Sequence, residues 1–153
     1  MKAVIIYGSH HHGSTKKLAQ AITERYGVEI FDAEAGEDVD LEAYDLIGFA
    51  SGIDFGEFYP AVTAFAERLP AGKAGFALYT CAKDNAKYGE QIRDIAQKRG
   101  CVYLGKYGCK GYNTYGPWKI IGGMNKNHPT REEIEGALRF YQGLAAQMEN
   151  GLS

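Results

Sequence analysis

The chain has 153 residues, of which 17 are basic and 19 are acidic, so its formal net charge is −2. A single domain of this length buries about two-thirds of the surface that its unfolded chain would expose, and it needs neither disulfides nor a metal for stability. The near-neutral charge argues against a nucleic-acid-binding surface and against a polybasic membrane segment.

The cysteines and the start of the chain favour a reducing compartment. Cys81, Cys101 and Cys109 are odd in number and include no C-x-x-C pair. The first residues lack a charged segment followed by a long apolar run, and no apolar run has the length of a membrane span. We therefore expect a cytoplasmic protein without a membrane span.

Short apolar runs alternate with helical patterns along the chain. The first run, residues 2–7, is rich in β-branched residues and ends at Gly8, as expected for a central strand buried on both faces. The other predicted strands are residues 28–31, 44–50, 75–79 and 101–107. The predicted helices are residues 14–26, 60–69, 88–99 and 130–148, the last beginning with a capping box from Thr130 to Glu133.

This alternation predicts an α/β fold, in which a five-stranded parallel sheet is covered by helices on both faces within one domain, residues 1–153. Ligands of such folds bind beyond the carboxyl ends of the strands. The loops that leave strands one, three and four are therefore the candidate site. They comprise residues 9–15, 51–58 and 80–87.

The first loop has the spacing of a nucleotide phosphate loop but carries Ser14 where such a loop has its lysine. Without that lysine, the hydroxyls of Ser9, Ser14 and Thr15 and the N–H groups after Gly13 suit one terminal monophosphate, such as that of FMN, better than a triphosphate. A plain helix N-cap at Ser14 is the alternative interpretation.

The same loop contains three consecutive histidines, His10, His11 and His12. Adjacent residues of an extended loop point apart, so these side chains do not converge on a metal by themselves, and His128 would have to approach them. We expect no metal here, and we interpret the histidines as neighbours of the phosphate or the flavin.

The second loop combines glycines with apolar side chains, as expected where a backbone lies along the edge of a flat ring. Its candidate binding residues are Ser51, Gly52, Ile53, Asp54, Phe55 and Gly56. The alternative is an ordinary strand-to-helix connection that places one Phe in the core.

The third loop supplies hydrogen-bond donors and a thiol, from Thr80, Cys81, Ala82 and Lys83. Cys81 would be redox-active only if a cation such as Lys83 favoured its thiolate, and otherwise it is a small, half-buried neighbour of the cofactor. Residues 108–129 form a long segment without clear periodicity, interpreted either as a lid or partner surface or as a cover packed on the fifth strand.

Charge is unevenly distributed along the chain. Residues 29–45 contain eight acids and no base, whereas residues 83–126 contain nine bases and three acids. Two interpretations remain open: ordinary solvated faces, or a polarised surface that orients a redox partner or an anionic substrate.

These loops resemble those of the flavodoxin family along nearly the full length of the chain. The similarity is carried by residues 4–18, by residues 44–52 and by His128-Pro129-Thr130 before the last helix. The family's phosphate loop commonly reads Ser/Thr-x-Ser/Thr-Gly-x-Thr, and residues 9–15 keep its start and its Gly-x-Thr end with one extra residue.

The resemblance implies a three-layer sandwich with strand order 2-1-3-4-5 and an FMN phosphate held by the first loop without a metal. The second and third loops would flank the isoalloxazine ring. It also implies electron transfer with a redox partner protein or a small-molecule donor or acceptor. The flavin supplies the chemistry, so no side chain is predicted to be catalytic.

Two departures from the family pattern argue against a dedicated electron carrier, and the closest rival function is an NAD(P)H-dependent FMN or quinone reductase. The chain is near neutral rather than strongly acidic, and it has Ile53 and Phe55 where a Trp is common, with only Tyr88 beyond the third loop. A receiver domain would need acids after strands one and three, where Ser9-His10 and Ser51-Gly52 stand. A flavin-free binding module and a homodimer remain open.

Overall fold

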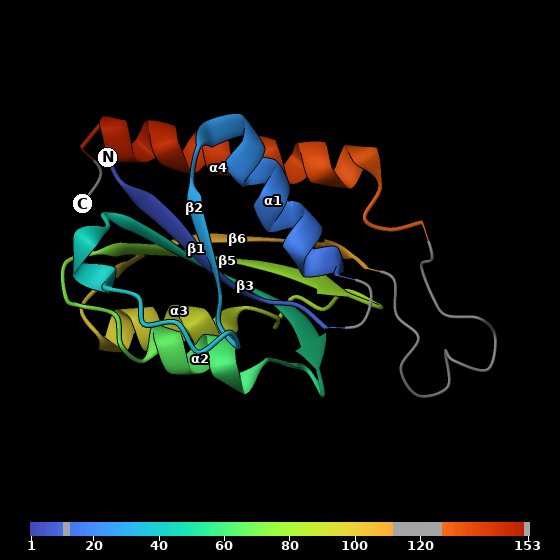
Figure 1. Ribbon diagram of the computed structural model, residues 1–153, viewed down its shortest axis with the longest axis horizontal. Helices are drawn as coiled ribbons and strands as arrows, with labels where there is room; N and C mark the ends of the chain where they lie inside the picture. The colour runs from blue at the N-terminus through green and yellow to red at the C-terminus, as the bar shows by residue number, and fades with distance from the viewer. Residues whose placement is uncertain (11–12, 112–126, 152–153) are drawn as a thin grey trace.

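A parallel sheet forms the centre of the molecule (Figure 1). The computed structural model describes residues 1–10, 13–111 and 127–151. Within these residues, five parallel strands lie in the order β2-β1-β3-β5-β6, which confirms the predicted order. The strands are β1 (Ala3–Gly8), β2 (Glu29–Asp32), β3 (Leu46–Asp54), β5 (Ala74–Cys81) and β6 (Val102–Lys110).

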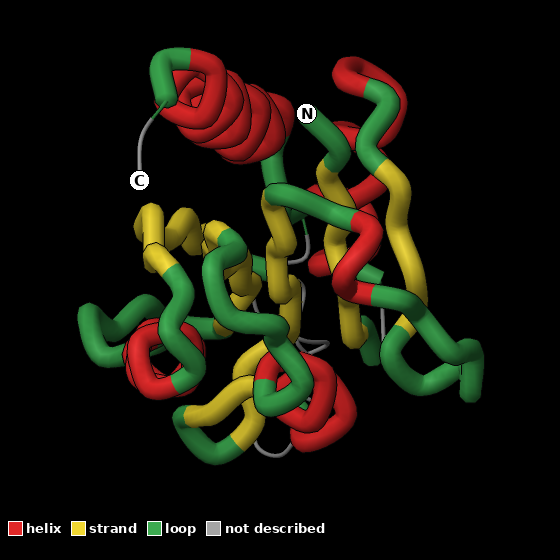
Figure 2. Tube along the Cα trace, turned by 90° about the vertical axis from the view of Figure 1, so that its left-hand side faces the viewer, coloured by secondary structure: helices red, strands yellow, loops and turns green. Residues whose placement is uncertain are grey.

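Four helices cover the two faces of this sheet within the described part of the chain, giving three layers (Figure 2). Helices α1 (Ser14–Tyr26) and α4 (Arg131–Glu149) lie on one face, and α2 (Pro60–Ala66) and α3 (Glu90–Lys98) lie on the other (Figure 1). A short 3-10 helix, η1 (Leu41–Ala43), precedes β3. The predicted α/β sandwich is therefore confirmed.

The apolar pattern of the sequence explains two cores, one on each side of the sheet. Ile22 of α1 and Leu138 of α4 pack with one set of strand side chains, which includes Ile5. Val62 of α2 and Ile92 of α3 pack with the opposite set. Side chains alternate along a strand, so a sheet covered on both faces needs continuous apolar strands, as β1 and β5 have.

Two strand glycines allow aromatic rings to lie across the sheet. A Cβ at Gly48 would overlap the ring of Phe76, and a Cβ at Gly108 would overlap the ring of Tyr79. In both cases the glycine and the aromatic residue lie on neighbouring strands. The missing side chain therefore provides the space in which the ring packs.

The helix ends agree with the sequence signals in two of three cases. Gly27 closes α1 in a left-handed conformation, with its N–H donating to the Thr23 carbonyl oxygen. The capping box of α4 is present in both directions between Thr130 and Glu133. The N-cap of α1, however, is Gly13, so the alternative of a plain N-cap at Ser14 is wrong.

Other expectations need correction at the ends of strands. Residues 108–110 belong to β6, so the segment interpreted as a loop from 108 begins inside a strand, and its residues 112–126 lie outside the described part. Ser51–Asp54 continue β3, and a short antiparallel strand β4 (Glu57–Phe58) pairs back onto it. The described helices include none that is long and apolar enough to span a membrane.

Candidate functional site

The three predicted site segments meet at the carboxyl edge of the sheet. Gly8 at the end of β1 pairs with Ser51 of β3, and Gly52 pairs with Thr80 of β5. The first segment then leads into α1, whose N-terminus lies at this edge (Figure 1). The structure therefore brings together segments whose first residues are 29 to 71 positions apart in the sequence.

The first segment leads into the N-terminus of α1 through a glycine N-cap. Gly13 takes a left-handed conformation at the N-cap and contributes no side chain, and the first turn of α1 contains no acidic residue. Ser9 lies before the helix, and its hydroxyl oxygen accepts from the Lys16 N–H at 3.2 Å. The first N–H groups of a helix carry partial positive charge, so this turn is suited to an anion. His11 and His12 lie outside the described residues.

Buried hydroxyls line the inner side of this turn. Thr15 is 1% exposed, and its hydroxyl forms a hydrogen bond of 2.7 Å with that of Thr80, which is 5% exposed. Ser14 is also buried. These contacts join the first segment to the third and fix the start of α1 against the sheet.

His10 connects the first segment to the second through Tyr59. The His10 ring is stacked on the Tyr59 ring, with 4.0 Å between the centroids and 11° between the planes, and its Nε2 pairs with the Glu34 carboxylate. Tyr59 in turn covers Gly52, where a Cβ would overlap the phenol. Burial, followed by the charges of Asp54 and Glu34, raises the pKa of Tyr59 to about 12.

Tyr59 was missed in the sequence because it stands outside the three predicted segments, directly before Pro60. Its side chain is buried, and its N–H donates to the Ser51 hydroxyl oxygen at 2.9 Å. An aromatic residue just before a helix-initiating proline gave no signal of contact with a histidine 49 positions earlier.

The second segment is a β-hairpin rather than a loop. Ile53 and Asp54 pair with Phe58 and Glu57, leaving Phe55 and Gly56 as the turn, both with positive φ. The alternative of one Phe in the core fits Phe58, which is buried, whereas Phe55 is 86% exposed. The hairpin therefore presents an aromatic side chain at the edge of the candidate site.

The third segment keeps its thiol neutral. Thr80 and Cys81 end β5, and Ala82 and Lys83 follow. Burial, assisted by Asp84 and Glu133, raises the pKa of Cys81 to about 12, and Lys110 rather than Lys83 is the cation that opposes this rise. A thiol that is protonated near neutral pH is a poor nucleophile, so Cys81 is a small buried neighbour of the site.

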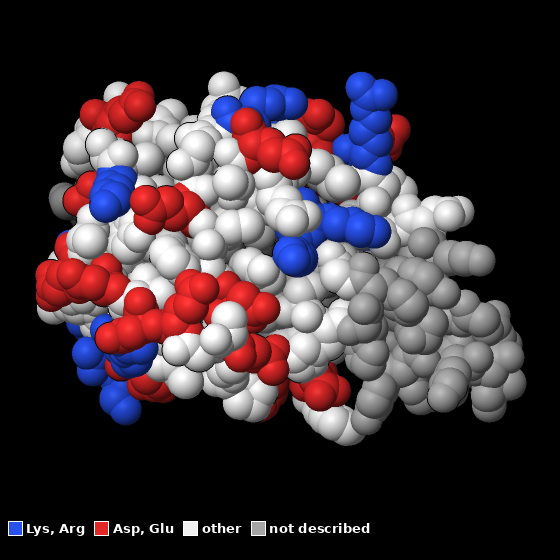
Figure 3. Space-filling model, viewed as in Figure 1, with Lys and Arg blue, Asp and Glu red and all other residues white. Residues whose placement is uncertain are grey.

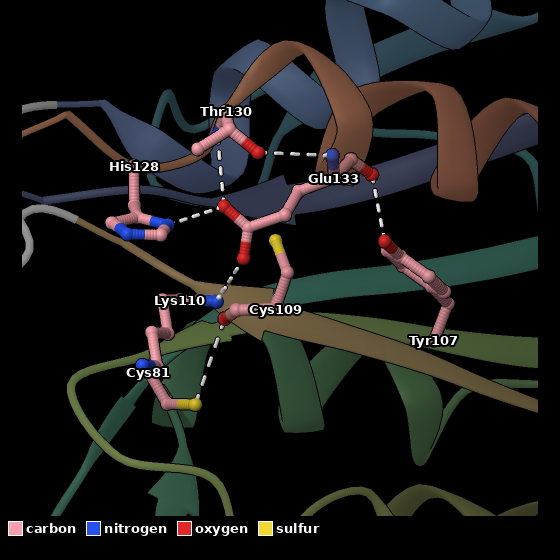
Figure 4. A network of polar contacts seen from close by, with 7 residues as sticks. All are labelled: Cys81, Tyr107, Cys109, Lys110, His128, Thr130 and Glu133. Atoms are coloured by element: carbon pink, nitrogen blue, oxygen red, sulfur yellow. Dashed lines mark hydrogen bonds and ion pairs between the residues drawn. The ribbon is translucent and has the colours of Figure 1, made fainter.

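A carboxylate that the sequence analysis assigned only to capping lies behind this edge (Figure 4). Glu133 Oε1 accepts from the Thr130 N–H at 2.8 Å and pairs with His128 Nδ1, while Oε2 accepts from the Lys110 N–H at 3.2 Å. Burial would raise the pKa of Glu133, but the hydrogen bonds from Thr130, His128 and Lys110 outweigh burial and lower it.

Acidic side chains gather on one side of the face seen in Figure 3, in the segment that follows β2 and includes η1. Two of them pair with cations, Asp38 with Arg68 at 3.0 Å and Glu42 with Lys73 at 3.9 Å. The predicted basic counterpart includes Lys119 and Lys126, which lie outside the described residues. The described residues contain no group of three or more metal-ligating side chains.

A family model described as Flavodoxin domain matches residues 4–110. The chain belongs to the flavodoxin family. The match includes all three segments at the carboxyl edge and ends at Lys110, so His128 and Glu133 lie beyond it. An uncharacterized protein of Methanocaldococcus jannaschii is 36% identical to this flavodoxin-family chain over 147 residues, which is 94% of this chain and 98% of that protein.

Several solved structures share the flavodoxin fold. A rubredoxin:oxygen oxidoreductase of Desulfovibrio gigas superimposes with a TM-score of 0.73 at 16% identity; it covers 99% of this chain, which spans 37% of that longer chain. A flavoprotein of Lactobacillus acidophilus, solved in complex with FMN, has a TM-score of 0.55 at 21% identity, covering 71% of this chain and 92% of that one. At these identities the likeness shows the fold alone.

Proposed function

We propose that this protein binds FMN at the carboxyl edge of its sheet and transfers electrons through the bound flavin. The observation that carries this proposal is the start of α1, where Gly13 at the N-cap has no side chain and the first turn contains no acidic residue. A terminal phosphate needs N–H and hydroxyl donors without a competing carboxylate, and this turn fits that requirement.

The hydroxyls of Ser9 and Ser14 would hold the phosphate together with the N–H groups of the first turn. The Thr15 hydroxyl forms a hydrogen bond with that of Thr80. Thr15 would therefore hold the turn against β5 and would not bind the phosphate. The absence of a lysine from residues 9–15 agrees with a monophosphate and disfavours a triphosphate.

The flavin ring would lie between the β3–β4 hairpin and the end of β5. Phe55 is the exposed aromatic side chain there, and Gly56 leaves the hairpin backbone accessible at its turn, whereas Gly52 lies beneath the Tyr59 ring. When bound, the flavin supplies the redox chemistry. The chain's own groups would orient the ring and exclude water from one side.

The test is a titration of the purified chain with FMN, followed by flavin absorbance and fluorescence. Ser9→Asp should weaken binding by about tenfold or more, because its carboxylate repels the phosphate, although it can still accept from the Lys16 N–H. Gln20→Glu is the matched control, because it adds the same charge on an exposed position further along α1. A wild-type chain that takes up no FMN would refute the proposal.

Anaerobic titration of the FMN-loaded protein with NADPH then separates the two redox functions. Rapid reduction by NADPH alone identifies a nicotinamide-dependent FMN or quinone reductase. Reduction that requires a partner reductase identifies an electron carrier. The reductase is kept as the second candidate because Phe55 places an aromatic side chain that is 86% exposed at the edge of the site.

A further inference from the structure

The carboxyl end of β6 is held from both sides. β6 is an edge strand of the sheet, so every second N–H of its backbone points away from β5. The Gly111 N–H donates inward to the Cys81 carbonyl oxygen at 2.9 Å, while the preceding N–H, that of Lys110, donates outward to Glu133 Oε2 at 3.2 Å. Glu133 therefore supplies the partner that the edge strand lacks.

Gly111, directly after β6, packs on the start of α1. A Cβ at Gly111 would lie 2.9 Å from Cβ of Ser14 and 3.0 Å from Cβ of Thr80. The Gly111 backbone therefore touches the turn that would hold the phosphate. A displacement of the β6 end would change the space beside Ser14.

Glu133 is itself fixed by groups of its own segment and by one residue of β6. The Thr130 N–H and His128 Nδ1 both bind Oε1, and the Tyr107 hydroxyl donates to the Glu133 carbonyl oxygen at 2.7 Å (Figure 4). One carboxylate thus joins the start of α4 to the end of β6. Its two oxygens have separate partners, so neither contact can be replaced by the other.

We propose that Glu133 is a positioning residue for the phosphate-binding turn. Its carboxylate holds Lys110, and thereby keeps Gly111 against Ser14. This inference rests on the proposed flavin site, and its test includes a measurement that does not use flavin.

The test compares three variants of the full chain. Glu133→Gln keeps one acceptor oxygen but replaces the other with an amide donor. The side chain can then no longer accept from the Thr130 N–H and the Lys110 N–H at the same time. Glu132→Gln removes the same charge from the same turn, on an exposed residue. Thr130→Ala removes the hydroxyl cap of α4 and leaves the Glu133 carboxylate in place.

Two readouts separate positioning from loss of stability. Hydrogen exchange should accelerate at the Lys110 and Gly111 amides in Glu133→Gln, with altered protection at Ser14, and not in Glu132→Gln. The FMN dissociation constant should rise by about tenfold in Glu133→Gln. It should stay within about twofold of wild type in Thr130→Ala, even though that variant has a lower melting temperature.

Wild-type exchange at Lys110 and Gly111 in Glu133→Gln would overturn the inference, whether or not FMN binds. So would an equal loss of FMN affinity in Thr130→Ala, because the effect would then follow helix stability. If wild type fails to bind FMN, the proposed function fails by itself, and faster exchange at Lys110 and Gly111 in Glu133→Gln alone still supports the positioning role.

Discussion

Thr15 and Thr80 bury two hydroxyl groups that have each other as partners, 2.7 Å apart. Thr15→Val leaves the Thr80 hydroxyl buried without its partner, so we expect the free energy of unfolding to fall by about 1–3 kcal/mol. The double variant with Thr80→Val removes both polar groups and should cost less than the sum of the single changes. Urea unfolding of wild type, the two single variants and the double variant measures these costs. A cost of the double variant equal to the sum of the single costs would contradict the prediction.

The lowered pKa of Glu133 gives the stability a defined dependence on pH. Because its folded pKa lies below the unfolded value of about 4.3, ionised Glu133 stabilises the fold above that value. This contribution is lost as the pH falls through the folded pKa. We therefore expect Glu133→Gln to cost about 1–3 kcal/mol near pH 6, and the difference from wild type to shrink towards pH 3.

Urea unfolding of both proteins across this pH range measures the effect of Glu133. A difference that stays constant with pH would show that the charge of the carboxylate contributes nothing, and that the loss comes from the amide donor that replaces one of its oxygens.

At the scale of the strand, β3 and β5 depend on one glycine that admits an aromatic ring. A Cβ at Gly48 would overlap the Phe76 ring, whereas a Cβ at Gly75 would lie 3.5 Å from the Ile47 carbonyl oxygen, an ordinary contact. We expect Gly48→Ala to cost about 1–3 kcal/mol more than Gly75→Ala, measured by urea unfolding. Combining Gly48→Ala with Phe76→Leu should recover part of the loss. Equal costs for the two single variants would refute the packing argument.

The elements that follow from local chemistry were predicted well from the sequence. Helix α1 begins and ends where Ser14 and Gly27 predict, because an apolar stripe and a glycine C-cap both act within a few residues. Ser51 and Gly52 were interpreted as a loop because polar residues and glycine disfavour strands. Their pairing with Gly8 and Thr80 extends β3 regardless. That pairing joins residues far apart in the chain, so it leaves no pattern in the local sequence.

The candidate site shows the same limit. The sequence predicts Ser9, Ser14 and Thr15 as binding residues, because a hydroxyl-rich helix start is a local signal. The contact of Tyr59 with His10 and that of Glu133 with Lys110 each join residues far apart in the chain. Glu133 was assigned one role from its position at N3 of a helix. Its contact with the Lys110 N–H depends on where β6 ends, which its own position in the sequence does not indicate.

The whole molecule places its three thiols at opposite edges of one sheet. Cys101 lies before β6 at the amino edge, while Cys81 and Cys109 lie at the carboxyl edge, and all three are buried. Burial raises the pKa of both Cys81 and Cys109 to about 12, so neither reacts readily in the native state near neutral pH. Alkylation of these thiols therefore reports the opening of the structure around each of them.

If residues 1–153 fold as one cooperative domain, the three thiols should be alkylated at one common rate, set by global unfolding. Gly48→Ala should then raise all three rates by the same factor, about tenfold for each 1.4 kcal/mol that it costs. Peptide mass spectrometry after timed exposure to iodoacetamide measures each site separately. Faster labelling of Cys81 and Cys109 than of Cys101 would contradict a single cooperative unfolding unit, because the carboxyl edge, with its candidate flavin site, would then open independently of the amino edge.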